Sequence, residues 1–160
     1  MDSTTRENIV AELRLLLVKG NAHISFEEAC ADIPLPLLTK TVPNLPYSIW
    51  QLVEHIRIDQ RDVLEFCRNP AYVSPKWPDA YWPAPVAAVD AARWEATLKQ
   101  IRNDRDQFIA LLEDSAQDLF ALFPHGTGQT LFREALLIAD HNSYHTGQIL
   151  LVRRLLQDWK

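Results

Sequence analysis

Apolar residues recur at intervals of three and four along four long stretches of the chain, and prolines lie between these stretches. The four stretches cover residues 1–33, 47–69, 86–123 and 125–160. Proline is avoided inside helices because it lacks a backbone donor and clashes with the preceding turn. Since apolar positions three and four residues apart share one face of a helix, the pattern predicts four long helices.

The first stretch contains signals that divide it into two elements. Gly20 follows the apolar face of the first helix and is a typical helix stop, because glycine readily adopts the left-handed cap conformation. Ser25 and Glu28 have the spacing of a capping box, in which each side chain bonds the backbone of the other residue. We therefore expect a short extra helix or loop after the first helix.

The remaining boundaries complete the fold prediction. The second long helix is expected to begin near Pro46 or Tyr47 and to end before Asn69, and the third to run from about Val89 to Phe120 with a break. The prolines of residues 70–85 exclude regular structure there. No alternating run of strand length occurs, so the sequence predicts an all-α four-helix bundle, with residues 1–160 as a single domain.

The last helix carries an apolar seam that is polar in its middle. His141 lies one turn before His145, and residues four apart stack on one helical face. Buried imidazoles and amides cost stability unless they find partners, so this seam predicts a group that satisfies them. The seam consists of Leu131, Ala135, Ile138, Asn142, His145, Ile149, Val152 and Leu156.

A third histidine, His55, lies near the middle of the second long helix at the margin of its apolar stripe. If this helix and the last one are neighbours, His55, His141 and His145 lie at similar depth and can converge. Neutral imidazole binds zinc, nickel, copper or iron, and three protein ligands leave a position for water or substrate. The alternative is that the histidines are ordinary core residues held by hydrogen bonds.

Other residues near these histidines are candidates for supporting roles. Asp59 lies one turn after His55 and could accept a proton from bound water or thiol, or orient a ligand imidazole; the alternative is a solvated carboxylate. Asn142 occupies the seam and could support the site or only hydrogen-bond another core group, and Gln148, three residues after His145, could line the same cavity. Gly147 is costly inside a helix, which predicts close packing at this position.

Residues 70–85 contain three large rings, Trp77, Tyr81 and Trp82. One hypothesis is a lid or substrate wall beside the metal, because aromatic side chains line most small-molecule pockets. The other hypothesis is that the rings cover the end of the bundle or form a dimer contact.

Composition and charge exclude several classes of protein. The 16 basic and 21 acidic residues give a net charge of −5, which argues against binding nucleic acid or an anionic membrane. The two cysteines are too few for a disulfide framework or a cysteine-based zinc site. No signal peptide or membrane-length apolar run is present, so we expect a cytoplasmic location.

Two segments resemble a known family. TLFREALLIADHNSYHTGQILLVRRLL is similar to the last helix of the DinB/YfiT-like superfamily, and SIWQLVEHIRIDQRDVLEF is similar to its second helix. The resemblance implies a four-helix bundle, often a homodimer, with a divalent metal on His55, His141 and His145. It also implies transfer of a low-molecular-weight thiol, such as bacillithiol or mycothiol, or a thiol-dependent isomerisation.

Three functions are consistent with these residues. The first is a metal-dependent enzyme that activates a small thiol and transfers it to an electrophile, in detoxification or stress response, with zinc or nickel, or else iron, as the ion. The second is a metal-hydroxide hydrolase, because thiol and water would compete for one open position. The third is a non-catalytic, metal-stabilised bundle that binds a partner.

Overall fold

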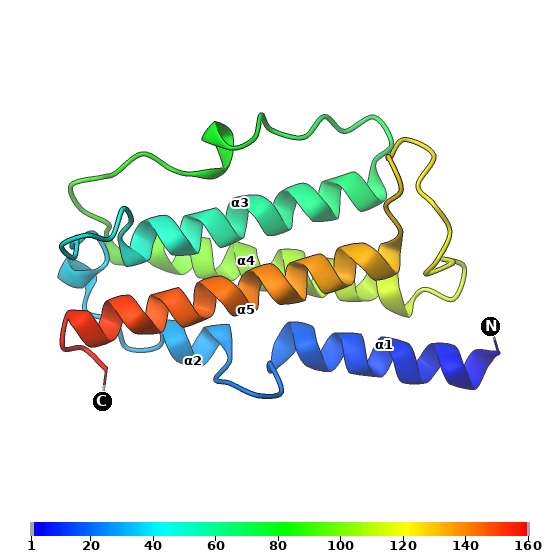
Figure 1. The fold of residues 1–160 in the computed structure, drawn as a ribbon, viewed down its shortest axis with the longest axis horizontal. Coiled ribbons are helices and arrows are strands. Elements are labelled where there is room, and N and C mark those ends of the chain that lie inside the picture. Colours follow the sequence, from blue (N-terminus) through cyan, green and yellow to red (C-terminus); the bar gives the residue numbers. More distant parts are fainter. Residues whose placement is uncertain (1, 160) are drawn as a thin grey trace.

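The computed structural model describes residues 2–159, and within this range it contains helices and one isolated β-bridge, between Leu122 and Thr130, but no strand. Two short 3-10 turns, η1 and η2, lie in the connections between helices. The all-α four-helix bundle is confirmed, and the expected short extra helix follows the first one (Figure 1). The elements are α1 (Ser3–Val18), α2 (Phe26–Cys30), η1 (Leu35–Leu37), α3 (Ile49–Arg68), η2 (Asp79–Tyr81), α4 (Ala91–Glu113) and α5 (Leu131–Leu155).

Each α-helix begins at a side chain that caps its free backbone N–H groups. Ser25 and Glu28 form the expected capping box at α2, and Ser48 forms a second box with Gln51 at α3. Asp90 caps α4 and Thr130 caps α5 through the backbone N–H three residues later. Such caps are worth about 1 kcal/mol each, so local sequence defines where these helices start.

Helix α3 packs against both α4 and α5 and is the central element of the bundle (Figure 1). Buried apolar side chains form two separate clusters along it. One cluster contains Ile56 and Ile149, and the other contains Leu64 and Ile138. Between the clusters, α3 and α5 carry polar side chains, so the core is divided by a polar layer at the level of the histidines.

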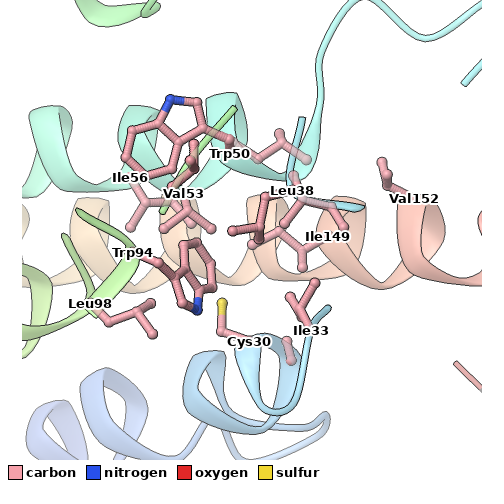
Figure 2. Close-up of a cluster of buried hydrophobic side chains, with 14 of the residues drawn as sticks. Cys30, Ile33, Leu38, Trp50, Val53, Ile56, Trp94, Leu98, Ile149 and Val152 are labelled. Atoms are coloured by element: carbon pink, nitrogen blue, oxygen red, sulfur yellow. The ribbon is translucent and has the colours of Figure 1, made fainter. Parts of the chain in front are cut away.

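The first cluster joins helices from both halves of the chain. Figure 2 shows Cys30 of α2, Trp94 of α4 and Ile149 of α5 gathered in one interior. Burial raises the pKa of the Cys30 thiol well above its usual range, so this cysteine remains a neutral, apolar side chain.

The proline-rich connection between α3 and α4 arches along the outer side of α3 (Figure 1). It is irregular, as predicted, apart from the single turn η2. Tyr81, at the end of η2, is buried and donates its hydroxyl to Asp62 Oδ2 at 2.6 Å. This bond attaches the connection to the middle of α3, beside the histidines.

Two details differ from the sequence-based expectation. Helix α4 ends at Glu113 rather than near Phe120, because the Asp114 side chain accepts from the backbone N–H of Ala116 and starts a turn. Gly147 is exposed, and a Cβ placed there would meet no atom within 4 Å. The expectation of close packing at Gly147 is therefore wrong within this chain.

Among the helices of residues 2–159, none combines the length and the apolar character that a membrane span needs.

Candidate metal centre

His55 of α3 and His141 and His145 of α5 meet in the polar layer between the two apolar clusters. One nitrogen of each ring lies within 4.8 Å of the corresponding atoms of the other two rings. The Nε2 atoms of His55 and His141 are 3.0 Å apart. His55 and His145 are buried, whereas His141 is half-buried at one edge. The arrangement has the donor type and the spacing that a transition-metal ion requires.

A different acceptor lies beside the outer nitrogen of each ring. Nδ1 of His55 lies 2.9 Å from the backbone oxygen of Tyr81, and Nδ1 of His145 lies 2.7 Å from Oε1 of Gln148. Nδ1 of His141 lies 3.3 Å from Oδ2 of Asp59. At His55 and His145 these contacts favour the tautomer with its proton on Nδ1, which leaves the lone pair on Nε2, whereas Nδ1 of His141 makes no hydrogen bond.

The lone pair on Nε2 of His55 faces Nε2 of His141 at 3.0 Å and can accept a hydrogen bond from that ring, and a bound cation would take the place of that proton. Burial lowers the pKa of all three imidazoles, and that of His141 falls to about 3 because the other two rings add to the effect of burial. The rings are therefore neutral at neutral pH, which is the form that binds metal ions.

Comparison with protein families identifies the chain. The model of the DinB superfamily matches residues 24–149, a region that contains α2, α3, α4 and most of α5. The chain belongs to the DinB superfamily. No match was found among curated proteins or among solved structures. Membership of the DinB superfamily and the cluster of three histidines fit a metal-binding protein.

Asp59 is the acidic residue closest to the imidazoles of this DinB-superfamily chain. It lines the cavity beside His141 as well as contacting Nδ1 of that ring. Burial raises the pKa of Asp59 to about 7, and the nearby charges of Asp62 and Glu134 act in the same direction. A divalent ion on the histidines would oppose this shift, because it favours the ionised carboxylate.

The aromatic residues of the proline-rich connection lie along the site rather than over an end of the bundle. The ring of Trp82 stacks on that of His55 with centroids 3.9 Å apart and an angle of 11° between the planes. The ring of Tyr47 stacks in turn on that of Trp82, with centroids 5.9 Å apart. Trp77 and Tyr81 line the cavity that opens beside His141. This geometry supports the hypothesis of a substrate wall.

The two amide residues singled out from the sequence have different positions. Gln148 contacts His145, as described above, while Nδ2 of Asn142 donates to Oε1 of Gln60 at 3.0 Å. Gln60 is buried and donates in turn to the backbone oxygen of Ile101 at 2.7 Å. Asn142 therefore connects α5 through α3 to α4 directly beside the histidines.

Sequence reasoning missed several residues of the site. The carbonyl of Tyr81 could not have been found, because every residue has one and only the path of the chain brings this one to His55. Asp62 and Glu134 could have been suspected, since each is a carboxylate on a face that also carries apolar core residues. Both are buried and line the cavity beside His141, whose volume is about 510 Å³.

Proposed function

We propose that this protein is a divalent-metal-dependent enzyme that activates a low-molecular-weight thiol and transfers the whole thiol, through its sulfur, to an electrophile. The observation that supports it best is the convergence of one nitrogen from each of three imidazoles, two of which contact an acceptor through Nδ1, beside a cavity of about 510 Å³. A purely structural histidine cluster would need no such cavity. We propose His55, His141 and His145 as the ligands and residues 1–160 as one functional domain.

Different residues of the chain have different roles in the proposed reaction. A bound divalent ion would act as a Lewis acid that lowers the pKa of a thiol at its open position. Asp59 would accept the thiol proton at its carboxylate, which a divalent ion on the histidines would keep ionised. The sulfur then forms a bond to the electrophilic carbon, and the proton passes from Asp59 to the departing group. Gln148 and Asn142 would hold the surrounding side chains in position.

Metal analysis of untagged protein tests the ligand assignment. We expect wild type to retain stoichiometric metal and both His55→Ala and His145→Ala to lose it while keeping their helical circular dichroism. His23→Ala is the matched control, because His23 is exposed in the loop between α1 and α2 and should leave metal content unchanged. Full metal retention in both site variants would overturn the assignment.

The nucleophile needs a separate test with metal-loaded protein. We expect consumption of thiol in the presence of a model electrophile, at a rate that depends on the bound metal. Cleavage of esters or amides without added thiol would instead support the metal-hydroxide hydrolase. Absence of turnover with either nucleophile would leave the metal-stabilised binding bundle.

The ion, the assembly and the location are further parts of the proposal. Zinc or nickel, or else iron, suits three imidazoles with an open position. A homodimer is supported by two exposed apolar side chains near the end of α5, Leu151 and Leu155. Detoxification of electrophiles by a small thiol would place the protein in the cytoplasm.

A further inference from the structure

The cavity beside His141 has an unusual combination of walls and charges. It lies between α3, α5 and the proline-rich connection, and aromatic side chains form much of its lining. Trp77 and Tyr144 are 65% and 64% exposed, so their ring faces are open to a ligand. Phe66 and Tyr81 add two rings deeper in the wall.

The titratable groups of this cavity are mostly acidic. Four carboxylates line it, and Arg133 is the one lysine or arginine among its lining residues within the part of the chain described. Arg133 is already paired with Glu134 at 3.0 Å. Among the described residues, no lysine or arginine lies within salt-bridge distance of Asp59, whose Oδ2 lies 3.3 Å from Nδ1 of His141. The four carboxylates belong to Asp59, Asp62, Glu134 and Asp140.

Asp62 shows that the charge is not satisfied within the fold. Its side chain is buried, with 9% of the residue exposed, and Oδ2 accepts the hydroxyl of Tyr81. Its other oxygen, Oδ1, is buried with no hydrogen bond within 3.5 Å, and although the Tyr72 hydroxyl also lies beside this carboxylate, neither phenol brings a positive charge. A buried carboxylate without a cationic partner is costly, and a ligand that brings a positive charge would offset that cost.

We propose that this cavity binds an organic cation, a protonated amine or quaternary ammonium group, held between the carboxylates and the aromatic faces. Rings attract a cation through their negative faces, and carboxylates add a longer-range attraction. In the reaction proposed above, this cation is the electrophilic substrate, since the cavity adjoins the histidines without containing His55 or His145. The assignment of the cation as the substrate rests on the proposed function, whereas the binding of a cation does not.

A matched pair of ligands tests the preference for charge. Choline and 3,3-dimethylbutan-1-ol have nearly the same shape and the same hydroxyl, and they differ in the positive charge. Calorimetric titration of zinc-loaded protein should give an affinity about tenfold higher for choline, the size expected of a cation at aromatic and acidic groups. Equal affinities, or no choline binding up to high millimolar concentration, would overturn the inference.

Three variants connect the preference to the cavity. Asp62→Asn removes a charge but keeps an acceptor for Tyr81, and it should weaken choline about tenfold without affecting the neutral alcohol. Trp77→Leu removes an exposed ring and should weaken choline by about threefold with the fold intact. Asp106→Asn, on the exposed side of α4 and outside the cavity, is the control for net charge and should have no effect. Unchanged choline affinity in both cavity variants would contradict the proposal.

The outcomes separate this inference from the proposed function. Choline binding with the expected variant effects, but no thiol consumption, would support the cation cavity and reject thiol transfer. Thiol transfer to neutral and cationic electrophiles at equal rates, with equal binding of the two probes, would reject the cation cavity alone.

Discussion

At the residue scale, the site depends on the groups beside the Nδ1 atoms as much as on the imidazoles themselves. A carbonyl, a carboxylate and an amide oxygen lie beside the three Nδ1 atoms, and the carbonyl and the amide oxygen hydrogen-bond their rings. The carboxylate differs from the other two acceptors because its charge changes with pH. Asp59 is therefore the residue whose substitution is most informative.

Asp59→Asn should stabilise the metal-free protein at high pH. The pKa of Asp59 is raised from 3.8 to about 7 in the folded state, so the folded protein binds more protons between these values and loses stability as pH rises through this window. Asp59→Asn does not lose this stability, because asparagine does not ionise. Its free energy of unfolding should exceed that of wild type by on the order of 2 kcal/mol at pH 8, and the difference should vanish near pH 4. Urea unfolding after treatment with chelator measures this.

The pKa shifts of the three histidines make stability change with pH in the opposite direction, and this change is expected to be the same in wild type and in Asp59→Asn. Their pKa values are lowered on folding, so both proteins lose stability as pH falls below 6.5. In zinc-loaded protein the effect of Asp59→Asn should reverse, with zinc affinity about tenfold lower because Nδ1 of His141 loses its carboxylate. A variant less stable than wild type at pH 8 without metal would contradict the role of buried charge.

At the scale of the element, capping residues and prolines defined helix limits, and tertiary contacts decided the exceptions. Periodicity alone extended the third helix to Phe120, since Leu119 is apolar and indeed buried. Leu119 reaches the core from a turn after Asp114 instead of from α4. Periodicity records which residues face the interior, and it does not distinguish a helix from a turn that returns to the same core.

Helix α5 offers a direct test of its exposed face. Gly147→Ala should raise the free energy of unfolding by roughly 1 kcal/mol, because alanine is the better helix former and its methyl group meets no atom. Thermal unfolding of the two proteins measures the change, with an alanine-to-glycine substitution at exposed Ala110 of α4 as the reverse control. A loss of stability in Gly147→Ala would mean that this face packs closely against another molecule.

At the scale of the whole molecule, the same face of α5 supports the proposed homodimer. Leu151 is 48% exposed and Leu155 is 52% exposed, and both lie on the side away from the core. Leu151→Glu should therefore convert a dimer to a monomer in sedimentation experiments while leaving the helical content unchanged. Val73→Glu, at an exposed position in the α3–α4 connection, is the control. A monomeric wild type would refute the dimer.

Arg153 shows why some placements could not be predicted. In the sequence it resembles a solvated arginine near the end of a helix. In the structure it is 4% exposed and donates to the backbone oxygens of Ala29 and Ala31, and to Asp158. Two of its acceptors are backbone oxygens more than a hundred residues away, and such groups have no residue-specific signal.

The sequence by itself determined the helices, the bundle and the candidate ligands. Proline positions, caps and apolar periodicity are local properties, and the spacing of His141 and His145 places both on one helical face. Only the tertiary structure decided that His55 joins them, that Tyr81 and Asp59 lie beside the rings, and that carboxylates from α3 and α5 share a cavity. These features depend on how helices distant in the sequence pack, and the burial that makes their charges chemically important exists only after that packing.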